Sequence, residues 1–406
     1  SSVIGKEVIY ISSFKQVETI EFNVSAKEIN NIIYVDSVGG LDSNDGSSWG
    51  SAVRTIGHAL SLLGGDKDTI YLAEGTYLEY GLNIGSSVSI VGFGNVVIDA
   101  ANKGGVFTVK VNGLNVEFRN LNFVNANTSG SFDNGGFICF SNGFTAVTGT
   151  GVIDNCTFRN SYASAYGGAV HNSGFDLVIN NSVFIQNTAK FSGALSVIGG
   201  STTVLNSVFV NNTIAGDAAR WGGAIRVQAG KLYVSGCVFL NNSADKGSGI
   251  YVAQSATEVV VNYCIFEGYP DGVTVIANDN SKLVVDANYN YFGANVIDGL
   301  VSSNVNATYW TILTVTPSSD VHVGDVVRLI IDFTKFTDGS NVYSLKQLMP
   351  TLTVSLVPTI GTVDPVSVVC VDGVASVNYV SSVIGKEVIY ISSFKQVGTI
   401  EFNVLS

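Results

Sequence analysis

Apolar and polar residues alternate along most of this chain. Clear examples are KLYVSGCVF (231–239), TTVLNSVFV (202–210) and EVVVNYCIF (258–266). Alternation with a period of two places every second side chain on one face, as in a half-buried β-strand, and the Val, Ile, Tyr, Phe and Thr of these stretches favour strands. Only residues 51–65 have a helical pattern. No apolar run reaches the roughly 18 residues of a membrane-spanning helix, so the pattern predicts an all-β protein.

The strands recur with a period of about 25 residues, which is typical of a solenoid. One landmark of the repeat is a Phe, at Phe123, Phe158, Phe184, Phe209, Phe239, Phe266 and Phe292. A second landmark is a Gly-Gly-Ala-Val type of segment, centred on Ala169, Ala194, Ala224 and Gly249. Each repeat buries its interior by stacking on its neighbours. We therefore expect parallel strands about 4.8 Å apart, an inward ladder of Phe, and a second ladder of Asn187, Asn212 and Asn242 in a turn.

The periodicity changes after Trp310. Strand and turn signals then follow each other at 8–12-residue spacing, beginning with TILTVTPSSDVHVGDVVRLIIDFTKFTDG. About seven short strands in about 95 residues are typical of a β-sandwich. The prediction is a second, antiparallel domain over the last quarter of the chain.

Several of these motifs resemble known families. The Phe-x-x-Asn and Gly-Gly-Ala-Ile pairing is similar to repeats of the polymorphic membrane protein family and of adhesin-like surface proteins of methanogenic archaea. The stretch IIYVDSVGGLDSNDGSSWGSAVRTIGHAL resembles the entry of right-handed parallel β-helices, whose short helix, here near 55–63, caps the open end. ANYNYFGAN (287–295) resembles the closing coil of the archaeal proteins, with Tyr291 and Phe292 where the family usually has a Trp pair.

The resemblance implies a fold and a domain order. The Gly324-Asp325, Asp338-Gly339 and Asp372-Gly373 pattern looks like the bacterial-type immunoglobulin-like modules of cell-surface adhesins. Together these resemblances imply an all-β chain, with a right-handed parallel β-helix over 30–309 followed by an immunoglobulin-like β-sandwich over 310–406.

Residues 1–24 repeat residues 381–404 almost letter for letter. The two copies differ only at Glu18 and Gly398. Two strands alone are marginally stable, so we expect residues 1–24 to be the last strands of a preceding immunoglobulin-like domain. The chain is then one repeat of a tandem stalk or filament, with neighbouring copies of itself as partners. The link could be covalent, or the strands could be donated to another subunit, which we rank lower.

Charge and composition narrow the class of partner. The net charge is −12 and the pI is about 4.6, which disfavours nucleic acid as a partner. The sequence shows no initiator Met, signal peptide or anchor, so we expect a mature piece or an excerpt. Asn-x-Ser/Thr sequons, some of which arise by chance in an Asn-rich chain, fit an extracellular, cell-surface location. These glycosylation candidates are Asn23, Asn127, Asn155, Asn180, Asn211, Asn241 and Asn306.

The sequence gives little support for catalysis. Pectinolytic hydrolases with this fold resemble one another in paired aspartates, a Gly-His-Gly and an Arg-Ile-Lys, and none of these is found here. The three His, at 58, 171 and 322, lie in unrelated contexts. DSNDGSS (42–48) fails the spacing of an EF-hand calcium loop and is typical of an Asx-rich turn. We predict a non-enzyme with no catalytic residue, no metal site and no cofactor.

One constellation suggests ligand binding. Three residues before the second landmark stand Tyr166, Phe191, Trp221 and Lys246. Trp221 closes an insertion, AGDAARW, that also contains Asp217 and Arg220. Aromatic rings in a row about 5 Å apart could stack on sugar rings, or they could shield the edge of the core and stack on each other.

Three functions follow from the sequence. The first is an adhesin-like or structural surface protein. The second is a carbohydrate-binding module that uses Tyr166, Phe191, Arg220 and Trp221 to bind cell-surface glycans. The third, which we rank last, is a polysaccharide-active enzyme.

Overall fold

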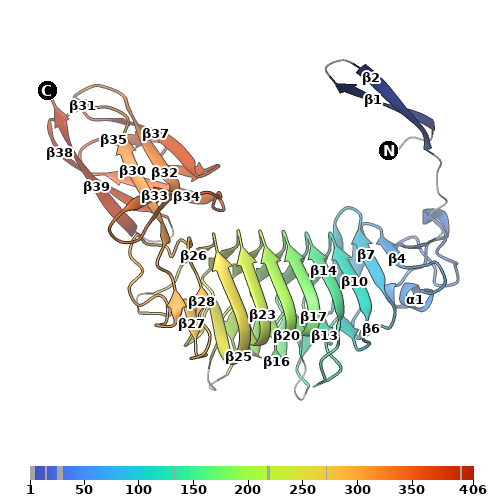
Figure 1. Ribbon diagram of the computed structural model, residues 1–406. Helices are drawn as coiled ribbons and strands as arrows, with labels where there is room; N and C mark the ends of the chain where they lie inside the picture. The colour runs from blue at the N-terminus through green and yellow to red at the C-terminus, as the bar shows by residue number, and fades with distance from the viewer. Residues whose placement is uncertain are drawn as a thin grey trace.

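The computed structural model describes residues 5–13, 16–24, 31–130, 134–143, 145–216, 220–270, 272–393 and 396–406, with the backbone alone at 5–24 and 396–397. Within these residues the protein is almost entirely β, and parallel sheets make up most of it (Figure 1). The prediction of an all-β chain is confirmed. None of the helices in the described part of the chain is long and apolar enough to cross a bilayer.

Three parallel sheets are built from residues 32–306. The largest contains β3 (Ile32–Val35), β4 (Thr69–Leu72), β6 (Leu82–Ile84), β7 (Val88–Gly92), β9 (Phe107–Val109), β10 (Leu114–Arg119), β13 (Ile138–Phe140), β14 (Gly149–Asp154), β17 (Val170–Asn180), β20 (Leu195–Leu205), β23 (Ile225–Ser235), β25 (Ile250–Asn262), β27 (Ile276–Asn278), β28 (Val285–Asp286) and β29 (Val305–Asn306). The second contains β5 (Gly75–Tyr77), β8 (Val96–Asp99), β11 (Asn122–Val124), β15 (Thr157–Arg159), β18 (Val183–Ile185), β21 (Val208–Val210), β24 (Val238–Leu240) and β26 (Ile265–Glu267). The third sheet contains β12 (Asn127–Thr128), β16 (Tyr162–Tyr166), β19 (Thr188–Phe191) and β22 (Thr213–Ile214).

Successive repeats stack side by side. In the second sheet the strands follow one another in chain order, so each repeat adds its strand next to that of the repeat before it (Figure 1). We call one repeat of this stack a coil. The register is set by identical residues: Phe184 pairs with Phe209, and Phe209 pairs with Phe239. Side chains of the same type therefore lie directly over each other along the stack.

The predicted Phe ladder is confirmed and runs through the core of the coils. The rings of Phe158, Phe184, Phe209, Phe239 and Phe266 are stacked, with successive centroids 4.6–4.9 Å apart and planes within 15°. All five rings have 0% of their surface exposed. Stacking at the strand spacing lets each ring fill the space between its neighbours without a void.

The predicted Asn ladder is also present, in the turn after the Phe strand. Asn187, Asn212 and Asn242 are buried. Each side-chain carbonyl of Asn212 and Asn242 accepts the backbone N–H and the side-chain NH₂ of the Asn in the coil before it. The side-chain NH₂ of Asn212 also donates to the carbonyl of Phe184 at 3.0 Å. The ladder satisfies turn groups that would otherwise be buried without partners.

A short helix lies next to the first coils. α1 (Ile56–Ser61) follows the 3-10 turn η1 (Trp49–Ser51) and falls inside the predicted range 55–63. Its N-terminus is capped twice: Thr55 Oγ1 accepts from His58 N, and the Glu79 carboxylate accepts from the first two helical N–H groups at 2.7 and 2.8 Å. These bonds satisfy donors that a helix start leaves open. Ile56 and Ala59 are fully buried against the coils.

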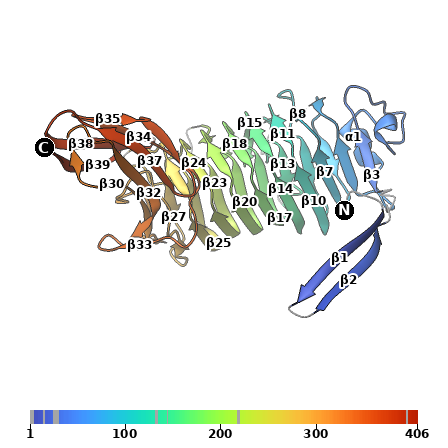
Figure 2. The same cartoon turned by 90° about the horizontal axis from the view of Figure 1, so that it is seen from above.

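The chain after residue 309 forms two antiparallel-rich sheets that enclose one core (Figure 2). One sheet contains β30 (Trp310–Pro317), β32 (Val327–Thr337), β33 (Val342–Ser344), β35 (Thr362–Asp364) and β37 (Val374–Val380). The other contains β31 (Val321–His322), β34 (Leu352–Pro358), β36 (Ser367–Cys370), β38 (Gly385–Ser392) and β39 (Gln396–Leu405). We call this part the C-terminal domain.

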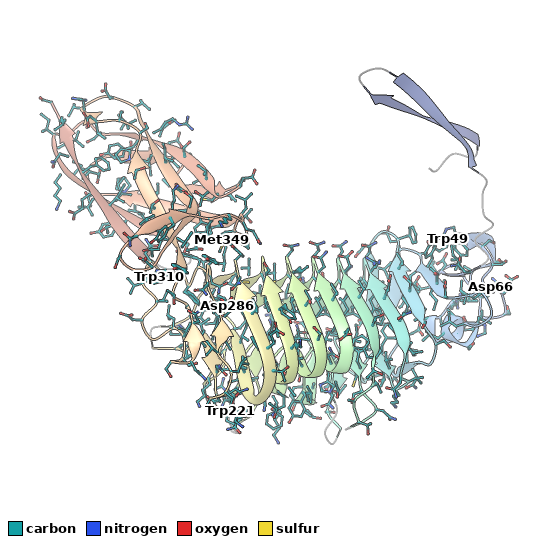
Figure 3. All side chains as sticks on the ribbon, in the orientation of Figure 1. Trp49, Asp66, Trp221, Asp286, Trp310 and Met349 are labelled. Carbon is teal, nitrogen blue, oxygen red and sulfur yellow. The ribbon has the colours of Figure 1, made fainter. Side chains whose placement is uncertain are left out.

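The C-terminal domain is anchored on the last coils. Tyr291 is fully buried in its core and meets Phe333 edge to face, with ring centroids 5.0 Å apart. Its neighbour Phe292 points the other way and ends the Phe ladder on Phe266. The indole of Trp310 donates to the carbonyl of Asn295 at 3.0 Å, and Figure 3 shows Trp310 and Met349 at this junction. The adjacent residues Tyr291 and Phe292 thus belong to different cores: Phe292 closes the core of the coils, and Tyr291 begins the core of the C-terminal domain.

The duplicated segment forms a hairpin at both places. β1 (Gly5–Ser13) and β2 (Gln16–Val24) pair with each other as a two-stranded sheet. In the C-terminal domain, the matching strands β38 and β39 also form an antiparallel pair, with a register shift next to the turn, and they pair in addition with β34 and β31.

Candidate functional site

The predicted aromatic row is present, but as two separate pairs of rings. Tyr166 ends β16 and Phe191 ends β19, and their rings stack with centroids 4.9 Å apart. Trp221 instead stacks on Tyr251 of the next coil, at 5.2 Å and 17°. Figure 3 places Trp221 at the lower edge of the coil stack. Tyr166, Phe191 and Trp221 are all half-buried, and they pack on each other rather than lying as one flat row.

The guanidinium of Arg226 lies among these four rings. Its central carbon is 5.4–5.7 Å from the centroids of Tyr166, Phe191, Trp221 and Tyr251. Aromatic faces attract a cation at this range. Arg226 is only 6% exposed, and burial lowers the pKa of its guanidinium below the ordinary value. Arginine nevertheless stays protonated in proteins, so a positive charge is held under the aromatic rings.

Arg226 belongs to a row of polar side chains on adjacent strands. His171 of β17 pairs with Ser196 of β20, and Ser196 pairs with Arg226 of β23. Leu195 and Val197, on either side of Ser196, face the core, so the alternation of a strand turns these polar side chains outward. We call His171, Ser196 and Arg226 the polar row. All three are more than nine-tenths buried, at 1%, 0% and 6% exposure.

The polar row has unsatisfied hydrogen-bonding atoms. His171 Nδ1, Ser196 Oγ, and Nε and Nη1 of Arg226 are buried without a hydrogen-bond partner. The remaining guanidinium nitrogen, Nη2, donates to the neutral side chain of Gln228. Burial lowers the pKa of His171 to about 3, so the imidazole is neutral at physiological pH. Unsatisfied buried polar groups are rare in folded proteins, and here they lie on three successive coils.

An open groove adjoins the polar row. Cys139 of β13 pairs with His171 on one side and with Thr108 of β9 on the other. Cys139 and Thr108 both line a groove of about 280 Å³, together with Lys110. Asn134, at the same groove, accepts a hydrogen bond from the backbone N–H of Tyr166. The groove therefore ends at the coil where the polar row and the stacked rings begin.

The other charged members of the predicted site have their own partners. Arg220 forms an ion pair with Asp245 at 3.9 Å. Lys246, the fourth position of the predicted row, pairs with Asp279 at 3.1 Å, and the hydroxyl of Tyr251 donates to the same carboxylate at 2.9 Å. Asp217 lies outside the described residues. The structure brings Tyr166, Phe191 and Trp221 together around Arg226, whereas Arg220 is engaged with Asp245.

The polar row was missed in reading the sequence, although a signal for it exists. Its residues stand two positions after the Ala of the second landmark, in AVH, ALS and AIR. The repeat alignment alone shows that this outward position changes from coil to coil. It does not show that the aromatic rings cover it, because that depends on how the side chains of β16 and β19 fold over the strand.

The remaining predicted sites fall in turns and edges. Asn155, Asn211 and Asn241 have positive φ angles of 51–55°. Asn155, Asn211 and Asn306 are exposed, Asn127, Asn180 and Asn241 are half-buried, and for Asn23 only the backbone is described. In DSNDGSS, the carboxylate of Asp42 accepts from the backbone and hydroxyl of Thr55 at 2.9 Å, which ties the loop to the start of α1. No group of three or more candidate metal ligands occurs within the described ranges.

Comparisons with known proteins found no match for this chain. No family model, no curated protein and no solved structure matches the sequence.

Proposed function

We propose that this chain is one repeat of a non-enzymatic, adhesin-like structural protein of the cell surface, of the kind seen in methanogenic archaea. In this proposal residues 30–309 form a right-handed parallel β-helix, and residues 310–406 form an immunoglobulin-like β-sandwich. Residues 1–24 are the last two strands of the sandwich that belongs to the preceding repeat. The observation that carries the proposal is that the two copies of the duplicated hairpin pair in the same register along most of their length.

The two hairpins share one register from their open ends to Ile11 and Ile391, and differ only next to the turn, where the second hairpin has a register shift. Gly5 pairs with Val24 and Glu7 with Phe22 in β1–β2. Gly385 pairs with Val404 and Glu387 with Phe402 in β38–β39, which are the same positions of the repeated sequence. The register of a strand pair decides which side chains face the core. The first hairpin is therefore shaped to take the place of the second in another copy of the same domain.

Glu387 shows which hydrogen-bond donors the hairpin requires from the rest of the sandwich. Its carboxylate is fully buried and accepts hydrogen bonds from the backbone N–H of Thr359 at 2.6 Å, from Gly361 N at 2.8 Å and from the hydroxyl of Tyr379 at 2.5 Å. Burial raises the pKa of this carboxyl, but these bonds outweigh it and hold the pKa below its usual value. The donors all come from outside the duplicated segment. Glu7, the equivalent residue, requires the same donors from a preceding copy.

The one sequence difference between the copies also fits this arrangement. A Cβ built on Gly398 meets no atom within 4 Å. The Glu18 of the other copy can therefore occupy this position in a preceding domain without a clash. Covalent tandem linkage is favoured over strand exchange, because β38–β39 already fill the hairpin site of their own domain and a donor would have to displace an identical segment.

Hydrogen–deuterium exchange tests this proposal. The chain is compared with a version extended at its N-terminus by a second copy of residues 310–380, which joins Val380 to Ser1. We expect the amides of β1–β2 to exchange quickly in the original chain and as slowly as those of β38–β39 in the extended chain, because the extension supplies the missing strands and core. A matched control carries Leu329→Asp in the added copy, which places a charge in the core of that copy.

Two results would argue against the proposal. One is an extended chain whose first hairpin exchanges as fast as in the original or in the Leu329→Asp control. The other comes from electron microscopy of the native material: isolated single particles, instead of a rod or filament with one regular repeat, would contradict a tandem array.

Glycan binding at the aromatic rings is a second candidate function. The observation that favours it is that Tyr166, Phe191 and Trp221 are only half-buried, and that the backbone N–H of Tyr166 donates to Asn134 at the edge of an open groove. Aromatic faces of this kind contribute to the binding of sugar rings. A glycan array with the wild type and Trp221→Ala tests it: we expect binding that the variant loses, and equal binding by both proteins would exclude the aromatic rings as the platform.

A further inference from the structure

The polar row is unusual for its position in the coil stack. Most outward positions of the strands are half-exposed, whereas His171, Ser196 and Arg226 are buried, and the aromatic rings lie around Arg226. Covering a polar side chain costs stability unless it finds a partner. Here three neighbouring coils each contribute a covered side chain with at least one unsatisfied atom. A common partner for all three would explain why the row is retained.

The unsatisfied atoms can all donate a hydrogen bond. Nε and Nη1 of Arg226 carry N–H groups only, the Ser196 hydroxyl has one hydrogen to donate, and the neutral imidazole of His171 can carry its hydrogen on Nδ1. Within the described residues, Arg226 forms no ion pair with a carboxylate. A buried positive charge surrounded by donors favours an anionic partner, and none of the described residues supplies one.

The surroundings indicate which kind of anion. One guanidinium balances one negative charge, which matches a carboxylate better than a doubly charged phosphate. The ring pairs Tyr166–Phe191 and Trp221–Tyr251 offer apolar faces to whatever carries the charged group. The groove at Cys139, the strand neighbour of His171, is lined by Lys110 and by polar side chains, and no Asp or Glu lines it among the described residues. This is a cationic path in a protein whose net charge is −12.

We propose that the polar row of His171, Ser196 and Arg226 binds a carboxylate group, which reaches it along the groove lined by Thr108, Lys110 and Cys139. The carboxylate accepts from the Arg226 guanidinium in a charge-assisted hydrogen bond and from the Ser196 hydroxyl, and the rings pack against the body of the ligand. Two sources have this chemistry: a free small carboxylate, or a uronate unit in an acidic glycan. The site lies in the coil stack and does not depend on the tandem arrangement of repeats.

Titration calorimetry with defined probes tests the site. The probes are sodium acetate, sodium D-glucuronate and D-glucose, at constant ionic strength, with the intrinsic tryptophan fluorescence, to which Trp221 contributes with Trp49 and Trp310, as a second readout. We expect D-glucuronate to bind and D-glucose not to bind. Ser196→Ala should weaken binding about tenfold and Arg226→Gln should abolish it, because each removes a donor to a charged ligand. Lys231→Gln is the matched control: it removes a charge from the same strand, where Lys231 is exposed and paired with Glu258 at 3.0 Å.

Each result has a defined meaning. Acetate binding as tightly as D-glucuronate assigns the site to a free carboxylate, and tighter binding of D-glucuronate assigns it to an acidic glycan. Failure of both carboxylates to bind the wild type, equal binding of D-glucose, or binding that Ser196→Ala leaves unchanged would overturn the proposal. Should Arg226→Gln not fold, Ser196→Ala decides. The exchange experiment on β1–β2 is read separately, so either proposal can fail alone.

Discussion

Replacing Asn212 tests whether the Asn ladder stabilises the coil stack. The side chain of Asn212 makes four hydrogen bonds of 2.9–3.0 Å. Its Oδ1 accepts from the backbone and the side chain of Asn187, and its Nδ2 donates to the carbonyl of Phe184 and to Oδ1 of Asn242. Asn212 is 0% exposed. Asn212→Ala would remove these four bonds, at about 1 kcal/mol each, so we expect a loss of about 4 kcal/mol in the free energy of unfolding.

Asn212→Asp separates the two halves of this bonding pattern. One carboxylate oxygen can still accept both bonds from Asn187. The other oxygen faces the Phe184 carbonyl and Asn242 Oδ1, which are acceptors, so the ionised form is repelled, whereas the protonated form can donate to one of them. The pKa of the new carboxyl is therefore raised above its unfolded value of about 3.9. A group whose folded pKa is raised binds its proton more tightly in the folded state, so the variant gains stability as the pH falls through that pKa.

The assay is guanidinium-induced unfolding at a series of pH values, with each variant referred to the wild type at the same pH. We expect the deficit of Asn212→Asp to shrink between pH 8 and pH 5, while the deficit of Asn212→Ala stays constant. Asn211→Asp is the matched control, because Asn211 is the adjacent residue and is exposed. A deficit for Asn212→Asp that is small, or that does not change with pH, would refute the ladder as a stabilising element.

Two further predictions concern the core and the polar row. Phe209→Ala should lower the free energy of unfolding by about 4 kcal/mol or more, because it removes a buried ring stacked on both sides. Phe292→Ala should cost less, because Phe292 has a single stacked partner. Equal losses measured by guanidinium unfolding would show that stacking along the ladder adds nothing. Burial holds the pKa of His171 near 3 in the folded protein against about 6.5 when unfolded, so this histidine should not affect stability above pH 6.5 and should contribute a loss of about 1.4 kcal/mol per pH unit as the pH falls from 6.5 toward 3. In His171→Asn this loss should disappear, and an unchanged pH profile in that variant would contradict the assignment.

The repeat could be predicted from the sequence because identical residues at a constant spacing must meet in parallel register. Phe184 and Phe209 are 25 residues apart, and the strands that contain them pair directly. The same logic places Asn187 beside Asn212. The course of the backbone around each coil follows from the same few residues, since the two landmarks lie 10 or 11 residues apart except in the coil that carries the AGDAARW insertion.

The candidate site could be predicted only in part, because it depends on side-chain packing between coils. The spacing correctly brought Tyr166 beside Phe191. It did not indicate that Trp221 would stack on Tyr251, or that Arg226 would reach across to Tyr166. A long side chain can contact rings two coils away, and the strand register does not determine which way it turns.

The positions where a coil departs from the repeat mark its junction with the C-terminal domain. At the turn before the Phe strand, earlier coils have Asn155, Asn181 and Asn206 with φ of 48–51°, a conformation that Asn tolerates. The last two coils have Tyr263 and Tyr289 there, with φ of 58° and 63°, which costs about 1 kcal/mol or more for a residue of this kind.

The two Tyr rings offset that cost through contacts that Asn could not make. They stack on each other with centroids 5.3 Å apart, and Tyr289 also meets Phe336 of the C-terminal domain edge to face at 5.0 Å. At these two positions, aromatic contacts with the second domain therefore offset the local strain. In this chain the change from Asn to Tyr at the turn position, visible in the sequence alone, marks the coils on which the C-terminal domain is mounted.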